Sequence, residues 1–187
     1  MRISTRPDAL DDERLNLLKK HGVTTVELGV QSMDDNVLKK SGRGHSSDDT
    51  RFAVTLIKEN WFKIGLQIMP GLPGDTAETI LHTAHDVIAL TPDFVRIYPT
   101  LVIKDTPLEK MFLSRTYKPW DLKDMILICK KVKTLFDEHK IPIIRIGLQT
   151  TEELRQNIIA GPFHPSFRQL LLSRTGADNM QSIKSLI

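Results

Sequence analysis

The sequence predicts an α/β fold in which parallel strands form part of a (β/α) barrel, and three observations support this prediction. Short runs of apolar and β-branched residues alternate along the chain with segments whose apolar residues recur at helical spacing. The intervening segments are long enough for the crossovers that parallel strands require. The strand-like runs number four to five, too few to close an eight-stranded barrel. We therefore expect part of a barrel with open sheet edges.

The first two strands and the helix between them are expected near the N-terminus. Arg2–Thr5 predicts a short strand that ends before Pro7. Asp11 is a typical N-cap for the helix that follows, and Gly22 is placed to end this helix. Val23–Val30 is short and rich in β-branched residues, so we expect the second strand there.

Two helices are expected before the third strand. Ser32 and Asp35 have the spacing of a capping box, and so do Ser46 and Asp49. Apolar residues at helical spacing follow the second box, and Asn60 can end that helix.

Residues Gly65–Thr76, GLQIMPGLPGDT, form the stretch around which we expect a binding site. They predict a buried strand that stops at Pro70, a rigid turn, and a helix for which Asp75 is the N-cap. A similar stretch, Val26–Ser32, precedes them. In α/β folds ligands bind at the carboxyl edge of the parallel strands, where both stretches end.

The second half of the chain continues the alternation. The predicted elements are a strand over Phe94–Tyr98, a helix beginning at Thr106 and Pro107, a helix over Leu122–Phe136, a strand over Ile141–Leu148, a helical turn over Thr151–Gln156 and a helix over Ser166–Leu172.

Composition restricts the class of protein. The 187 residues are 40% hydrophobic, enough for one domain with a core. The formal net charge of +3 is mild and its charges are interspersed, which favours a solvated surface over a nucleic-acid patch. The chain has no apolar run long enough to span a membrane and no signal peptide, so we expect a cytoplasmic protein. Its single cysteine, Cys129, falls in an apolar helical stripe, which favours a packed thiol over a nucleophile.

Several polar residues are candidates for binding, each with a structural alternative. Arg43 stands between two glycines and is either an exposed loop arginine or a ligand contact. Gln67 is the one amide in an apolar strand, satisfied by the backbone or by a ligand. Arg96 lies on a polar strand face or in the barrel mouth. His45 and His164, in loops bounded by glycine or proline, are the two histidines that merit a functional hypothesis.

The order and spacing of several motifs resemble those of radical S-adenosylmethionine (SAM) enzymes, in particular oxygen-independent coproporphyrinogen III oxidase and the Elongator-type catalytic subunit. Three motifs carry this resemblance: Glu27–Ser32 (ELGVQS), Arg43–His45 (RGH) and Gly71–Asp75 (GLPGD). Three more favour the bacterial Elongator-like branch: Ile3–Asp8, Val95–Ile103 and Ala160–Arg168. The resemblance covers nearly the whole chain.

The resemblance implies a six-stranded partial barrel, of which residues 1–175 would be the C-terminal part, followed by a polar tail over 176–187. It also implies SAM and a 4Fe–4S cluster held by a CxxxCxxC-type loop after the first strand. That loop is expected before Met1, and the lone Cys129 cannot replace it. The chain is therefore expected to be a fragment, by truncation or by an internal start, and inactive in radical chemistry as it stands.

The resemblance also implies a SAM-facing wall. Gln31 and Arg43 fall on the positions that contact SAM in the oxidase pattern. Their chemistry agrees with this role, since an amide suits a ribose hydroxyl and a guanidinium suits the methionine carboxylate. Gln67 and Ser4 fall where the oxidase pattern has acidic residues, and we include both as candidate cofactor-binding residues.

Three functions remain open at this point. The first is a fragment of a radical SAM oxidoreductase that acts on tRNA or on a small molecule. The second is a non-catalytic barrel module that binds a nucleotide or a protein partner. The third is an ordinary α/β enzyme, for which no nucleophile–base constellation is present. The unpaired sheet edge also predicts self-association.

Overall fold

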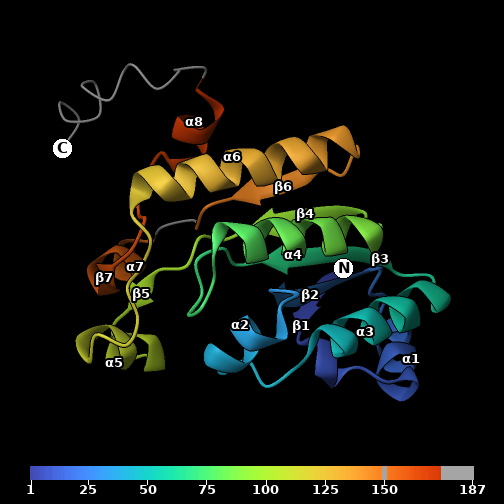
Figure 1. Cartoon of the computed structure of the whole chain (residues 1–187). Coiled ribbons are helices and arrows are strands. Elements are labelled where there is room, and N and C mark those ends of the chain that lie inside the picture. The colour runs from blue at the N-terminus through green and yellow to red at the C-terminus, as the bar shows by residue number, and fades with distance from the viewer. Residues whose placement is uncertain (149–150, 174–187) are drawn as a thin grey trace.

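The computed structural model describes residues 1–148 and 151–173 and contains a five-stranded sheet of order β1-β2-β3-β4-β6 (Figure 1). All four strand pairs are parallel, which confirms the predicted partial barrel of parallel strands. Spatial order follows chain order, as it does when each crossover advances the sheet by one strand around a barrel. The strands are β1 (Arg2–Thr5), β2 (Thr25–Gln31), β3 (Lys63–Ile68), β4 (Phe94–Ile97) and β6 (Ile143–Ile146).

The connecting helices α3, α4 and α6 line up on one face of the sheet (Figure 1). None of the helices in the described ranges has the length and apolarity needed to cross a bilayer. The helical elements are η1 (Pro7–Ala9, a 3-10 turn), α1 (Asp12–Lys20), α2 (Asp35–Lys40), α3 (Ser47–Glu59), α4 (Ala77–Ala89), α5 (Pro107–Leu113), α6 (Leu122–Glu138), α7 (Glu152–Asn157) and α8 (Phe167–Leu172).

The core lies between this helical layer and the sheet. Leu28 of β2 and Leu66 of β3 are register partners, and both are 0% exposed. Phe136 of α6 is also fully buried in the same cluster. Because side chains alternate along a strand, the residues between these apolar positions project from the opposite face of the sheet, which we call the inner face.

A second sheet was not predicted. It pairs β5 (Val102–Ile103) with β7 (Ile158–Ala160) in antiparallel fashion, beside α5 and α7 (Figure 1). Strands of two and three residues are too short to show an alternating pattern, so nothing local distinguishes them from loops.

Most predicted helix starts are confirmed. Asp11 accepts a hydrogen bond from the Arg14 backbone amide, and Ser46 and Asp49 form the predicted capping box. Thr106 caps α5, which has proline at its first turn. The predicted tail over 176–187 lies outside the described residues, and the boundary at residue 175 stays a prediction.

Two predicted caps are wrong. The N-cap of α2 is Asp34, because the hydroxyl of Ser32 is engaged elsewhere and accepts from the Asp34 amide. The N-cap of α4 is Thr76, because the carboxylate of Asp75 turns back to accept from the amide of Gly71. In both cases a tertiary or turn contact competes for the side chain that the local pattern favours.

Gly65 leaves room for side chains on the inner face. A Cβ atom at this position would lie 2.3 Å from the ring atoms Cε2 and Cζ of Phe94 and 3.2 Å from Cγ of Glu27. The absence of a side chain on β3 therefore lets residues of β2 and β4 lie over it.

We expect Gly65→Ala to lower the free energy of unfolding by about 1–3 kcal/mol, because the added methyl overlaps the Phe94 ring. In a Phe94→Ala background the same substitution should cost much less, and urea unfolding of the four variants measures this coupling. Equal costs in the two backgrounds would contradict the proposed overlap.

Candidate functional site

The ends of β2 and β3 meet at the carboxyl edge of the sheet. Gln31 has a φ of 66°, and the β2–β3 register shifts between Gly29 and Gln31. Beyond the shift, the Met69 amide donates to the Gln31 carbonyl at 2.8 Å, so the two strand ends stay joined. The left-handed backbone at a non-glycine residue costs energy, so the contacts around Gln31 must hold it in place.

This corner brings two of the predicted site residues together. Gln67 Nε2 donates to Gln31 Oε1 at 3.2 Å. The Gln31 side chain folds over Gly29, whose Cβ would lie 2.5 Å from Gln31 Nε2. Within the described part of the chain, Gln31 Nε2 and Gln67 Oε1 have no further hydrogen bond, so the NH2 group of Gln31 and the carbonyl oxygen of Gln67 remain for a ligand.

A buried hydroxyl network supports the corner from α4. Thr83, 4% exposed, accepts from the Met33 amide at 3.0 Å, and its hydroxyl lies 3.3 Å from that of Ser32. A lone threonine within a helix carries no sequence signal for this contact, and Thr83 was not predicted.

Arg43 lies in the loop between α2 and α3, as its two flanking glycines predicted. Gly42 and Gly44 have φ values of 63° and 74°, which favour glycine. The Arg43 guanidinium contacts the Met69 sulfur, with Nη2 3.1 Å from Sδ, so Met69 connects Arg43 to the Gln31 corner. Met69 was not predicted, because an apolar residue at a strand end is usually explained by packing.

The Arg43 guanidinium has no acidic partner in the described ranges, and its buried Nε atom has no hydrogen bond there. Burial, with a further contribution from Arg6, lowers the pKa of Arg43. Arg6 is itself matched by Asp8, to which it donates two hydrogen bonds. The local excess of positive charge is therefore concentrated on Arg43.

Both arginines line a cavity of about 390 Å³. Its walls come from the loop that carries Arg43, from the ends of β3 and β4, and from α5. Leu72 and Met111 contribute apolar surface to the same cavity. A cavity with cationic and apolar sides suits a ligand that has both an anionic and an apolar part.

The Pro70–Gly74 turn forms part of this wall and is fixed by internal hydrogen bonds. Asp75 accepts from the Gly71 amide at 2.9 Å and from the Thr79 hydroxyl, while the Tyr117 hydroxyl donates to the Gly71 carbonyl at 2.6 Å. Burial raises the pKa of Asp75. Burial and the charge of Asp75 raise that of Tyr117.

The two candidate histidines make structural contacts. His45, 9% exposed, places Nε2 3.1 Å from the Val30 carbonyl and so ties the arginine loop to β2. His164 accepts from the Ser166 amide through Nδ1 at 3.0 Å. Ser4 is the register partner of Glu27, four residues before Gln31, so it lies roughly 13 Å from the Gln31 corner along the strand.

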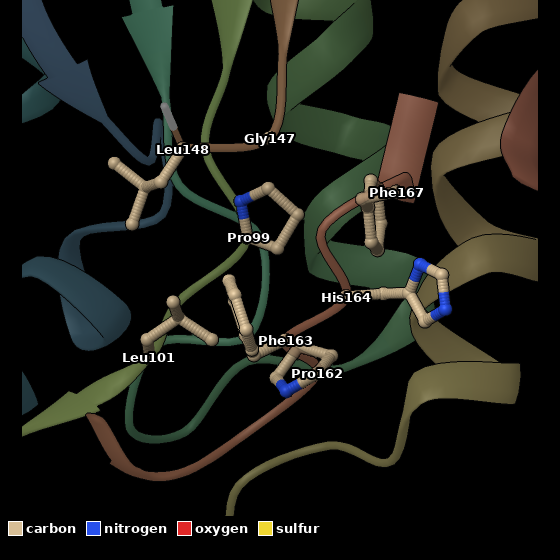
Figure 2. A pocket seen from close by; sticks show the side chains of 8 residues that line it. All are labelled: Pro99, Leu101, Gly147, Leu148, Pro162, Phe163, His164 and Phe167. Atoms are coloured by element: carbon tan, nitrogen blue, oxygen red, sulfur yellow. The ribbon is translucent and has the colours of Figure 1, made fainter. Parts of the chain in front are cut away.

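His164 lies at one end of an apolar notch between the ends of β4 and β6 and the 161–165 loop. Figure 2 shows the Phe163 ring near Pro99 and Leu101, with His164 beyond it beside Phe167. The notch has a volume of about 10 Å³, which leaves room for about one water molecule. The notch therefore holds the loop against the sheet and is too small for a cofactor.

Cys129 does not fit an iron–sulfur ligand. It is 0% exposed in the core face of α6, and burial raises its thiol pKa to about 12. It is also the only cysteine in the 187-residue sequence. Among the described residues, no group of three or more His, Cys, Asp or Glu side chains could hold a metal ion.

Comparison with known proteins agrees with this geometry. Residues 1–87 match the radical SAM superfamily, and residues 92–175 match the radical SAM C-terminal domain. The tRNA uridine(34) acetyltransferase of Methanocaldococcus infernus is 37% identical over 136 residues, which are 71% of this chain and 26% of the relative.

Two solved structures are also similar. Archaeal Methanocaldococcus infernus Elp3 with an N-terminal deletion superposes with a TM-score of 0.80 and 31% identity, over 91% of this chain and 40% of that one. Coproporphyrinogen III oxidase from Escherichia coli, a radical SAM enzyme, superposes with a TM-score of 0.62 and 19% identity, over 74% of this chain and 32% of that one, which shows the fold alone.

The parallel partial barrel and the two family matches show that the chain belongs to the radical SAM superfamily. Within the superfamily the chain belongs to the Elp3-like branch, and tRNA uridine(34) acetyltransferases are among the relatives to which it is similar. The chain spans between a quarter and two fifths of the length of the first acetyltransferase relatives.

Because the pKa of Asp75 is raised in the folded state, we expect its ionisation to oppose folding. The unfolded chain loses this proton near pH 3.8 and the folded chain only at higher pH, so stability falls as pH rises between the two values. The difference in unfolding free energy between wild type and Asp75→Asn should therefore decrease with rising pH over this range.

Asp49 is the matched control, because hydrogen bonds from Ser46 lower its pKa. Its stabilising effect is present above pH 3.8 and is lost as pH falls through the lowered value, so the wild type minus Asp49→Asn difference should increase with pH. Denaturant unfolding between pH 2.5 and 7 compares the two. Slopes of the same sign would contradict the assignment.

Proposed function

We propose that this chain is the SAM-binding part of a radical SAM enzyme that modifies tRNA, with the cluster ligands supplied from outside these 187 residues. The observation that carries the proposal is the half-buried Arg43 guanidinium, whose Nε atom is buried without a hydrogen bond, which has no acidic partner in the described ranges, and which lines the cavity at the carboxyl edge.

The Arg43 site fits the methionine carboxylate of SAM. A desolvated guanidinium without a counterion is costly, and a carboxylate that accepts two parallel hydrogen bonds compensates for this cost. Arg6 lines the same cavity and adds positive potential, although Asp8 largely neutralises it. The apolar wall beside Leu72 accommodates the uncharged part of such a ligand.

The Gln31–Gln67 pair fits the ribose of SAM. The NH2 group of Gln31 and the carbonyl oxygen of Gln67 remain after their mutual hydrogen bond, and a ribose presents two neighbouring hydroxyls that can engage both groups. Ser4 remains a candidate, although its register position places it deeper along the sheet.

Members of the superfamily use SAM and a 4Fe–4S cluster, and such a cluster would supply one-electron chemistry towards SAM. The residues of this chain do not fit as cluster ligands, because the one thiol is buried in α6 and protonated. What this chain contributes is therefore binding: Arg43, Gln31 and Gln67 orient the cofactor at the mouth of the sheet.

The names of the relatives support tRNA as the substrate. The first relatives are tRNA uridine(34) acetyltransferases, which favours RNA modification over the oxidase-type reaction that the sequence alone also allowed. A protein of this kind is expected in the cytoplasm. The lone cysteine favours one alternative function, a non-catalytic barrel module that binds a nucleotide or a protein partner.

Replacing Arg43 by methionine should weaken SAM binding at least tenfold. Hydrogen bonds to a charged group contribute about 1.5–3 kcal/mol, and methionine keeps the packing against Met69. Stability should stay equal or rise, because a buried charge without an acidic partner is removed. Calorimetric titration with SAM and thermal unfolding measure the two effects.

The control for this substitution is Arg14→Gln on α1, an exposed arginine that is paired with Asp11 and does not line the cavity. It should leave SAM affinity unchanged. An Arg43→Met variant that unfolds more easily and binds SAM normally would assign Arg43 a purely structural role.

Anaerobic iron–sulfur reconstitution of the 187-residue chain should yield no cluster that depends on Cys129, because the buried thiol is protonated and lacks two further thiolates. Visible absorbance and iron content of wild type and Cys129→Ser should match. A stoichiometric cluster in the wild type that is lost in the variant would overturn the claim that the ligands come from elsewhere.

A further inference from the structure

The inner face of the sheet carries a buried ion pair. Glu27 of β2 is 2% exposed, and its Oε1 lies 3.2 Å from Nε of Arg96 on β4, across the side-chain-free Gly65 of β3. The contact is an ion pair and not a hydrogen bond, because Arg96 Nε has no hydrogen-bond partner in the described ranges. The other carboxylate oxygen, Glu27 Oε2, has none there either. Arg2 approaches the same carboxylate at 3.7 Å.

One register row connects this pair to the candidate cofactor site. Gly29, Gln67, Arg96 and Arg145 are successive partners across β2, β3, β4 and β6. Arg96 is flanked by the core residues Val95 and Ile97, and Arg145 is followed by the core residue Ile146, so both side chains leave the helix-covered face. The β4–β6 register shifts between Val95 and Arg96, directly before this pair. Arg96 and Arg145 therefore lie side by side on adjacent strands, whose backbones are about 5 Å apart, and Gln67 is the partner of Arg96 on its other side.

Positive charge exceeds negative charge on this face. Arg2 and Arg96 both approach the Glu27 carboxylate, and Arg145 adds a third guanidinium on the strand beside Arg96. Arg96 also donates from Nη1 to the Tyr98 hydroxyl at 3.1 Å, which fixes its guanidinium. Arg145 is half-buried, and no hydrogen bond or ion pair engages it within the described ranges.

We propose that Arg145, with Arg96 beside it, binds a phosphate group of the nucleotide substrate on the inner face of the barrel. Two neighbouring guanidiniums present donors in the planar fork that phosphate oxygens match. Glu27 and Tyr98 hold Arg96 in place, so Arg145 is the arginine free to close on the ligand. The inference rests on the proposed function, and it assigns the substrate to a site distinct from the cavity of Arg43.

The proposal is tested by calorimetric titration of the protein with uridine 5′-monophosphate, with uridine and with an anticodon stem–loop RNA. The phosphate-bearing probes should bind, with an affinity that falls as salt rises, and uridine should bind at least tenfold more weakly. Arg145→Gln should weaken the phosphate-bearing probes at least tenfold, and Arg145→Lys should weaken them less. The matched control is Arg168→Gln on α8, which packs against α6 on the helical side of the sheet.

Arg145-dependent binding of the monophosphate assigns the site to a single nucleotide, whereas Arg145-dependent binding of the RNA alone assigns it to a phosphodiester of a polynucleotide. Phosphate binding that is absent, or unaffected by Arg145→Gln, would overturn the proposal. SAM affinity, measured in parallel with Arg43→Met, separates this failure from failure of the proposed function. An unchanged melting temperature of Arg145→Gln shows that a lost signal is not caused by unfolding.

Discussion

The structure depends on the strict division of its sheet into a helix-covered face and an inner face. Leu28 and Leu66 pair in register beneath the helices, and the hydrophobic burial there contributes most of the folding free energy. The inner face is thereby released from packing requirements. It can hold Glu27 and Gln67, which would be destabilising among the apolar side chains of the other face.

Glycines determine how the inner face is used. At Gly29 and Gly65 the missing side chains leave space that Gln31 and Phe94 occupy from neighbouring positions. The left-handed backbone of Gln31 follows from the same corner, where β2 shifts register and the Met69 amide closes the gap. A strained backbone persists only where its surroundings hold it, and here hydrogen bonds from β3 and the Thr83 network do so.

The elements with strong local signals could be predicted from the sequence. The five parallel strands and the Ser46–Asp49 capping box were predicted because periodicity and capping chemistry are local. The short β5–β7 pair and the Asp75 contact to Gly71 could not be predicted, since both depend on segments that meet only in the folded chain. The sequence likewise placed Arg43 in a glycine loop but carried no signal that Met69 would be its neighbour.

Two arginines on different parts of the sheet carry a positive charge that no neighbouring carboxylate neutralises in the described ranges. Arg43 and Arg145 lack acidic partners in the described ranges, although Asp8 and Glu27 show that the fold can place a carboxylate beside an arginine when it requires one. A half-buried guanidinium without a counterion loses hydration, and an anionic ligand at the carboxyl edge and another on the inner face would compensate for this loss. Because the two arginines lie on different elements, one anion cannot be assumed to satisfy both. A cofactor carboxylate at the edge and a substrate phosphate inside give each its own counterion.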